Sequence, residues 1–365
     1  MKPKKIALVG FHLSGGGAAR VMANLSNYFN DQGLEVHIII LHDQLGYSYS
    51  GVLFNLGKLK SKTNSVFNKI KRLLQFRAYV KKHNFDIIID FRFRKRVLQE
   101  WLINRLVYGE IPVVYTVHSS KLDIYLPKSN FWANAIYANC HSLVTITQEM
   151  EAMVKGKYPG LNNVNTISNP LDVSTVKDQA IEDIDLDFNY IIGAGTYDTS
   201  VKQFDKLIEA YAKSQLPLKN IHLVILGTGK LLNFLKLVAR DLGVSNHVHF
   251  IGFQPNPYKY FSKARFFVLS SKYEGMPMVL MEALCCEIPV VSFDCPTGPK
   301  EIITNRVNGV LVPNQQLHEL TNAMNRLIND EQLYATLKQG TLASIEKFSL
   351  NTIGKQWMKL IKVDK

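Results

Sequence analysis

Two glutamates, Glu274 and Glu282, stand eight positions apart in a segment rich in glycine, proline and apolar residues. The apolar run Arg265–Ser270 predicts a strand, and Met278–Cys286 predicts a helix that begins just after the loop at Glu274. Amides at the start of a helix, with the positive end of its dipole, attract phosphate. A carboxylate instead accepts hydrogen bonds from sugar hydroxyls and repels phosphate. Carboxylates beside phosphate-directed amides are what a sugar nucleotide requires.

A second corner of the same kind follows. The run Ile288–Phe293 predicts a strand, and the loop Pro296–Pro299 with Gly298 precedes another helix start. A structural interpretation competes with the chemical one: a buried strand–helix–strand unit whose acids only cap a helix. The flanking strands and the two glycine–proline loops favour the chemical interpretation.

The order of residues in this segment resembles the E-G-x-P-x-x-L-x-E-A signature of retaining glycosyltransferase family 4. The resemblance implies that Glu274 contacts a donor sugar and Glu282 the ribose of the nucleotide. It also implies that the Gly298 loop lies near the sugar or the phosphates. The matching residues are Glu274, Gly275, Pro277, Leu280, Glu282 and Ala283. Met276 and Met278 occupy unspecified positions of the signature, and the resemblance implies that the amides of Gly275–Met278 take the leaving-group charge.

A third glycine corner follows the first predicted strand, Ile6–Gly10, and opens a helix that runs to about Asp31. Taken alone it is equally consistent with phosphate binding and with tight packing. Gly16, Gly17 and Arg20 match the family's G-G-A-E-R-V start, although Ala19 replaces the Glu. We expect these three residues to face the acceptor.

His118 ends the predicted strand Pro112–His118 and resembles the His of the family's E-H-S motif, with Val117 in place of the Glu. A lone histidine at a strand end is more often structural than catalytic. The resemblance implies instead that His118 reaches the donor sugar.

The family's G-R-L…K motif has a partial counterpart that begins at Gly195. Lys202 is available as the cation for the donor diphosphate, but Thr196 stands where the family has an arginine. A hydroxyl cannot replace the paired donors of a guanidinium group, so we expect another basic residue to cover the diphosphate. Gly227 and Gly229 open the next helix and are expected on the donor side.

The charge of the chain is concentrated in its first half. The 365 residues include 43 Lys and Arg against 30 Asp and Glu, and residues 1–170 alone hold 22 against 10. Such an excess indicates an anionic partner; nucleic acid, an anionic membrane and a diphosphate-bearing lipid all qualify. The helix predicted over Asn64–His83 is basic and amphipathic, which suits a membrane surface or an ordinary crossover helix. The basic run after the strand Asp86–Phe91 predicts acceptor contacts by Arg92 and Arg94.

Strands alternate with helices along the chain, which predicts an α/β protein with parallel, doubly wound sheets. The family resemblance implies the GT-B architecture, two Rossmann-like domains with a cleft between them. We expect an acceptor-binding domain at residues 1–172, a linker at Val173–Asp187 and a nucleotide-sugar domain at residues 188–348. The last helix, within residues 349–365, is expected to pack back on the first domain.

The resemblance implies a retaining, metal-independent transferase that moves a hexose or N-acetylhexosamine, with UDP the commonest nucleotide, to a glycan acceptor. No D-x-D metal motif stands in a suitable loop, and no cofactor beyond the nucleotide sugar is expected. Because the apolar runs are only strand-sized, we expect a cytoplasmic protein that can bind peripherally at the inner face of a membrane and act on a lipid-linked acceptor.

Three alternatives remain open. A nucleotide-sugar epimerase of the same fold would need no acceptor. A catalytically silent partner subunit would explain Thr196. A nucleic-acid-binding protein would explain the basic half, but not Glu274 and Glu282, and because no base-stacking aromatic motif is evident we expect no nucleic-acid partner.

Overall fold

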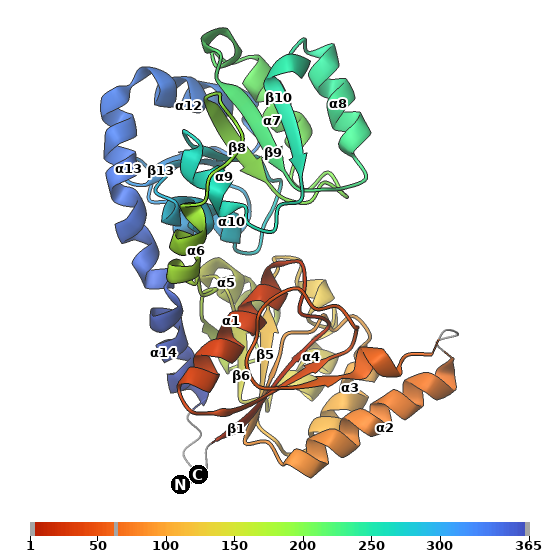
Figure 1. Ribbon diagram of the computed structural model, residues 1–365. Helices are drawn as coiled ribbons and strands as arrows, with labels where there is room; N and C mark the ends of the chain where they lie inside the picture. Colours follow the sequence, from red (N-terminus) through yellow and green to blue (C-terminus); the bar gives the residue numbers. More distant parts are fainter. Residues whose placement is uncertain (1–3, 62–64, 362–365) are drawn as a thin grey trace. The chain divides into compact units, whose positions relative to one another are not determined.

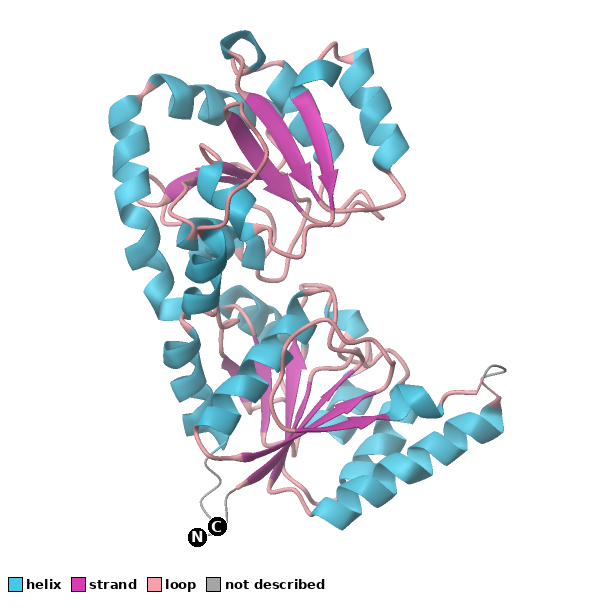
Figure 2. Cartoon of the chain, in the orientation of Figure 1, coloured by secondary structure: helices cyan, strands magenta, loops and turns pink. Residues whose placement is uncertain are grey.

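A computed structural model describes residues 4–61 and 65–361 (Figures 1 and 2). The chain divides into two compact units. The first contains residues 1–170 and 350–365, and the second contains residues 171–349. The final helix therefore belongs to the unit formed by the beginning of the chain.

The first unit is built on a seven-stranded parallel sheet with the order β3-β2-β1-β4-β5-β6-β7. Its strands are β1 (Lys5–Gly10), β2 (Glu35–Ile40), β3 (Val52–Asn55), β4 (Ile87–Asp90), β5 (Val113–Val117), β6 (Ser142–Thr145) and β7 (Val164–Thr166). Its α-helices are α1 (Gly17–Asp31), α2 (Val66–His83), α3 (Val97–Leu102), α4 (Asn130–Tyr137), α5 (Gln148–Lys157) and α14 (Leu350–Ile361), and a π-helical segment, η2 (Ile103–Tyr108), continues α3.

The second unit has a six-stranded parallel sheet with the order β10-β9-β8-β11-β12-β13. Its strands are β8 (Tyr190–Ala194), β9 (His222–Leu226), β10 (Val248–Gly252), β11 (Phe267–Leu269), β12 (Val290–Phe293) and β13 (Gly309–Val312). Its helices are α6 (Val173–Ala180), α7 (Phe204–Ala212), α8 (Leu232–Asp241), α9 (Tyr258–Lys263), α10 (Met278–Cys285), α11 (Pro299–Ile302), α12 (Leu317–Asn329) and α13 (Glu331–Ile345).

Both sheets are wound in the same way. In the first, the chain moves outward from β1 to β3 and then returns to place β4 beside β1; in the second, it moves from β8 to β10 and returns to place β11 beside β8. The prediction of two doubly wound α/β domains is confirmed. In such sheets, ligands bind at the carboxyl ends of the strands where the winding reverses. Ligands are therefore expected at the carboxyl ends of β1 and β4 and at those of β8 and β11.

The central strands are buried on both faces, as expected for parallel sheets covered by helices. α14 contributes the buried Ile353, Trp357 and Ile361 to the core of the first unit. Gly354 lies so close to the Tyr28 ring on α1 that a Cβ there would be 2.4 Å from it. Within the described residues, no helix combines the length and apolarity needed to cross a bilayer.

Two predictions of local structure were wrong. Residues Val173–Ala180, expected in a linker, form α6 and pack against α9 and α10. The side chain of Asp172 caps this helix by accepting a hydrogen bond from the Thr175 amide at 3.1 Å. The segment Leu45–Thr63 has no clear apolar period and is predicted to be rich in turns, but it contains the edge strand β3.

Candidate active site

Three loops meet at the carboxyl ends of β8, β11 and β12 in the second unit. The Ser270 hydroxyl, just after β11, donates hydrogen bonds to the carbonyls of Lys202 (2.8 Å) and Gln203 (3.1 Å) in the loop after β8. The Thr297 hydroxyl, after β12, donates to the carbonyls of Glu274 (2.8 Å) and Gly275 (3.0 Å). These bonds fix the loops that carry the predicted donor site at the point where the winding reverses.

Lys202 and Glu274 form an ion pair inside this cluster. The Lys202 Nζ atom lies 2.6 Å from Glu274 Oε1, and the side chains are 22% and 11% exposed. The residues are 72 positions apart in the sequence. The structure thus brings together the cation and the carboxylate that the two separate motifs predict.

α10 begins directly after this loop, with Pro277 as its N-cap. Proline has no side chain that could accept a hydrogen bond from the first amides of the helix, and no acidic residue stands in the first turn. The amides at the start of α10 are thus the kind of group that binds phosphate. Glu282 lies in the second half of α10 and is buried.

Glycines allow these loops to approach one another. A Cβ on Gly298, whose φ is +95°, would lie 2.7 Å from the Gly275 carbonyl oxygen and 2.7 Å from Pro277 Cδ. A Cβ on Gly227 would lie 2.0 Å from the Gly195 carbonyl oxygen. Both glycines are therefore required by packing, whatever they contribute to binding. A Cβ on Gly229 would lie 2.2 Å from the Tyr197 carbonyl carbon. Thr196, which precedes Tyr197 in the loop after β8, is exposed.

The residues predicted on the acceptor side lie in the first unit. Gly16, with φ of +81°, is the N-cap of α1, and Gly17 begins that helix. The guanidinium group of Arg20 lies 5.1 Å from the centre of the Tyr47 ring. Their contact with an acceptor stays a prediction.

His118 follows β5, and both of its ring nitrogens are buried. Burial, reinforced by the charge of Arg94, lowers the pKa of His118 to about 3, although a hydrogen bond with Asn169 acts in the opposite direction. The imidazole is therefore neutral at neutral pH and can contribute hydrogen bonds but no positive charge. Its contact with the donor stays a prediction.

The expectation that Arg92 and Arg94 contact an acceptor is corrected by the structure, because the first unit uses both guanidinium groups internally. Arg92 is buried, with Nη2 2.7 Å from Asp90 Oδ2 and 2.9 Å from Glu100 Oε2. Arg94 donates to the backbone carbonyls of Asp90, Arg92, Thr116 and Tyr125. Burial alone would raise the pKa of Asp90, but the charges of the two arginines outweigh it and lower that pKa.

Sequence reasoning missed the residues that hold these groups in place. Ser270 and Thr297 join the loops of the donor site, and Glu100 pairs with Arg92 from α3. The available signals were that Ser270 ends the predicted strand Arg265–Ser270 and that Thr297 lies in the predicted loop Pro296–Pro299. Among residues 4–61 and 65–361, no group of three or more His, Cys, Asp or Glu side chains is arranged to hold a metal ion.

Comparison with protein families agrees with this geometry. Residues 15–175 match the model described as Glycosyltransferase Family 4, and residues 175–342 match that described as Glycosyl transferases group 1. Together these matches span residues 15–342, which contain every strand of the two sheets except β1. The chain belongs to glycosyltransferase family 4.

Curated relatives of this glycosyltransferase include two from Campylobacter jejuni. One is N-acetylgalactosamine-N,N'-diacetylbacillosaminyl-diphospho-undecaprenol 4-alpha-N-acetylgalactosaminyltransferase, 25% identical over 98% of this chain and 99% of the relative. The other is named as an alpha-1,4-N-acetyl-D-galactosaminyltransferase acting on a PP-undecaprenol-linked glycan, also 25% identical and covering 98% of each chain.

Solved structures share the fold at lower identity. Anabaena HepE in complex with UDP and glucose superposes with a TM-score of 0.79 at 18% identity, over 99% of this chain and 100% of that one. A glycosyltransferase from Rickettsia africae also gives a TM-score of 0.79, at 16% identity over 99% and 98% of the two chains. These likenesses establish the two-domain GT-B fold.

Proposed function

We propose that this glycosyltransferase moves a hexose or N-acetylhexosamine from a UDP-linked donor to a glycan acceptor, with retention of the anomeric configuration and without a metal ion. The observation that carries the proposal is the Lys202–Glu274 ion pair, which lies next to the first turn of α10 at the end of β11.

The pair suits the charges that develop during transfer. The departing UDP gains negative charge, which Lys202 and the amides at the start of α10 stabilise. A carboxylate such as that of Glu274 accepts hydrogen bonds, and in this position it would accept them from sugar hydroxyls. Because Lys202 neutralises Glu274 at 2.6 Å, the carboxylate can stand beside a diphosphate without strong repulsion. Buried Glu282 would hold the ribose.

Two kinds of relatives support the substrates. Solved structures of the same fold are described as complexes with UDP or UDP-glucose. Full-length relatives are named for acceptors linked to undecaprenol through a diphosphate, and others for amylovoran biosynthesis and lipopolysaccharide galactosyl transfer. We therefore propose a lipid-linked glycan acceptor in the synthesis of a bacterial surface polysaccharide.

A donor panel tests this proposal. UDP- and GDP-sugars are incubated with the protein, with and without a bacterial lipid extract, in EDTA and in Mg²⁺, while nucleotide release is measured. We expect UDP release that depends on the extract but not on Mg²⁺, and NMR of the product should show the donor's anomeric configuration. Conversion of the sugar with donor alone would indicate an epimerase. No turnover by the wild-type protein, restored by Thr196→Arg, would indicate a silent subunit.

We also propose that the first unit binds an anionic membrane peripherally from the cytoplasmic side. Phe67, at the start of α2, is 86% exposed, and the adjacent Val66 and Leu98 on α3 are exposed as well. The segment from Lys58 to Arg105 holds 14 basic and 3 acidic residues. Apolar side chains among positive charges are typical of helices that lie at an anionic bilayer surface.

Vesicle sedimentation tests the membrane proposal. The protein should sediment with anionic vesicles at low salt and be released at high salt, and Phe67→Ser should weaken binding by about tenfold. The matched control is Leu218→Ser, because Leu218 is 89% exposed on the second unit. Equal binding by both variants, or no sedimentation at any salt concentration, would contradict the proposal.

A further inference from the structure

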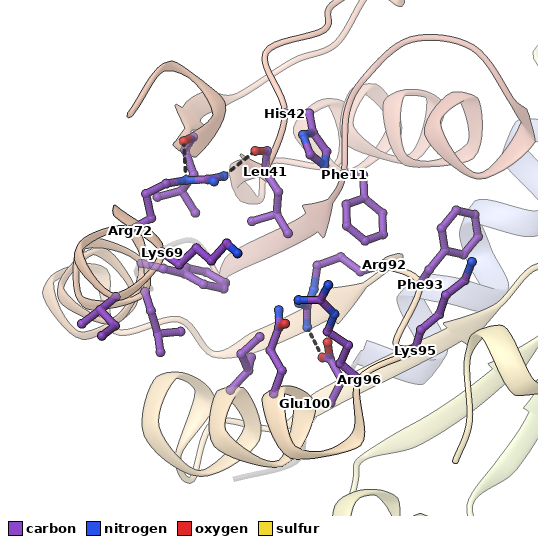
Figure 3. A pocket seen from close by; sticks show the side chains of 16 residues that line it. Phe11, Leu41, His42, Lys69, Arg72, Arg92, Phe93, Lys95, Arg96 and Glu100 are labelled. Carbon is purple, nitrogen blue, oxygen red and sulfur yellow. Dashed lines mark hydrogen bonds and ion pairs between the residues drawn. The ribbon is translucent and has the colours of Figure 1, made fainter. Parts of the chain in front are cut away.

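A cavity of about 620 Å³ lies in the first unit, where the winding of its sheet reverses (Figure 3). Phe11 follows β1, Leu41 and His42 follow β2, and residues 92–96 follow β4. α2 and α3 close the sides. The volume is within the range of about 300–1,000 Å³ that small-molecule sites occupy. The sheet therefore presents a cavity where doubly wound folds bind ligands.

The walls of the cavity are mainly apolar. α2 contributes Ile70, Leu73 and Phe76, which are spaced at intervals of three residues and therefore lie on one face of the helix. The segments that follow β1, β2, β3 and β4, together with the π-helical segment η2, supply the remaining apolar surface. These side chains are Phe11, Leu41, Leu56, Ile70, Leu73, Phe76, Phe93 and Ile103.

The positive charges around the cavity are of two kinds. Arg72 donates hydrogen bonds to the carbonyls of Leu41 and Leu56, and Arg92 is paired with acids, so both are already occupied. The other three basic side chains that line the cavity, Lys69, Lys95 and Arg96, are exposed.

These three side chains remain available to a ligand. Within residues 4–61 and 65–361, none of them has an ion-pair partner. Figure 3 shows Lys69 extending over the cavity from α2, while Arg96 lies on the opposite wall. Glu100, the one acid in the lining, is paired with Arg92, and its burial raises its pKa. The opening of the cavity thus has a surplus of positive charge.

We propose that this cavity binds the isoprenoid units next to the diphosphate of a prenyl-diphosphate-linked acceptor, with Lys69, Lys95 and Arg96 contacting the diphosphate. The apolar walls would contact the branched hydrocarbon and remove it from water. The three cations would form charge-assisted hydrogen bonds with the oxygens of the diphosphate. This inference rests on the proposed function, because it assumes a lipid-linked acceptor. It assigns the diphosphate of the acceptor to Lys69, Lys95 and Arg96, whereas the sequence predicted acceptor contacts by Arg92 and Arg94.

Calorimetric titration of the full-length protein tests the inference with three probes: farnesyl diphosphate below its micelle concentration, inorganic pyrophosphate and farnesol. Each buried methylene strengthens binding by about fourfold. Farnesyl diphosphate should therefore bind on the order of a hundredfold more tightly than pyrophosphate, and at least about tenfold more tightly than farnesol. Pyrophosphate or farnesol binding as tightly as farnesyl diphosphate would overturn the proposal.

Matched variants on α2 locate the site. Ile70→Asn should weaken farnesyl diphosphate binding by about tenfold. The control is Leu74→Asn, which should leave binding unchanged because Leu74 is one turn away and does not line the cavity. The two side chains are a matched pair because they are 52% and 56% exposed. Lys69→Gln should likewise weaken it more than Lys71→Gln, since Lys71 is exposed but does not line the cavity. Equal effects within each pair would refute the assignment.

UDP titration and glycosyl transfer are measured on the same samples, so that the two proposals can fail separately. Transfer to a lipid-linked acceptor with farnesyl diphosphate binding insensitive to Ile70 and Lys69 would overturn the cavity assignment alone. Site-dependent binding of farnesyl diphosphate by a protein that neither binds UDP nor transfers sugar would leave the cavity assignment standing and overturn the proposed function.

Discussion

Replacing Lys202 with methionine should damage both activity and stability through Glu274. The Nζ–Oε1 distance is 2.6 Å and both side chains are less than a quarter exposed. Exposed ion pairs contribute about 0–1 kcal/mol, and breaking a fully buried pair costs about 3–5 kcal/mol. This partly buried pair lies between these limits, so we expect Lys202→Met to lower the free energy of unfolding by about 2 kcal/mol.

A double-mutant cycle separates the pair from the individual residues. Glu274→Gln combined with Lys202→Met leaves no unpaired charge, so the double variant should be less destabilised than the sum of the single variants, by about 1–2 kcal/mol. Urea unfolding measures these differences. Additive effects would show that the ion pair does not contribute to stability in solution.

The effect of Lys202→Met on activity should be larger, because the lysine also meets the charge on the departing UDP. Loss of one such preorganised group typically lowers kcat by about 10²–10³. UDP release measures the loss, and Lys206→Met is the control, because Lys206 stands on α7 with its own partner Glu209 at 2.9 Å. Turnover by Lys202→Met within about threefold of wild type would refute this role of Lys202.

Three further predictions concern the surrounding structure. The pKa of His118 is about 3 in the folded protein instead of 6.5, so between these pH values only the unfolded chain binds the proton. From pH 6.5 to pH 5, the free energy of unfolding of wild type, measured in urea, should therefore fall by about 2 kcal/mol relative to that of His118→Gln. A difference between the two proteins that does not change with pH would contradict this. Gly298→Ala should lower the free energy of unfolding by about 3 kcal/mol, because the new Cβ would collide with the Gly275 carbonyl. The control Gly243→Ala should lower it by about 1 kcal/mol, because φ is +71° there but no atom of the described residues is close. Similar melting temperatures for the two variants would contradict this. Arg92→Met leaves the buried Asp90 and Glu100 without their partner and should lower the free energy of unfolding by about 3–5 kcal/mol. Replacing the exposed Arg96 with methionine should change it by less than about 0.5 kcal/mol. Equal urea midpoints for the two variants would show that the Arg92 ion pairs do not stabilise the fold.

The sequence predicted the elements whose burial is uniform. The predicted strand Ile288–Phe293 contains β12, whose four residues are all buried, and the run Met278–Cys286 differs from α10 by one residue at its end. Buried parallel strands appear as continuous apolar runs, which makes them easy to recognise. β3 was missed because it is a four-residue edge strand in which no residue is buried. α6 was missed because Val176 alone of its residues is buried, which gives no apolar period.

The donor site was more predictable than the acceptor side. Glu274 and Lys202 each lie in a loop that follows a strand, and parallel strands bring the loops at their carboxyl ends together. Arg92 and Arg94 also follow a strand, but their partners could not be read from sequence. Glu100 returns from α3 to pair with Arg92, and Arg94 binds carbonyls as far away as Tyr125. Charge at a strand end therefore indicates position, while tertiary contacts decide whether that charge is available.

The most direct test of the account is whether Glu274 holds the sugar of the donor. UDP and the UDP-sugar most active in the donor panel are titrated into wild type and Glu274→Gln. Because a hydrogen bond to a charged group contributes about 1.5–3 kcal/mol, the variant should bind the UDP-sugar at least about tenfold more weakly while its affinity for UDP changes little. Equal affinity of both proteins for the UDP-sugar would contradict the account.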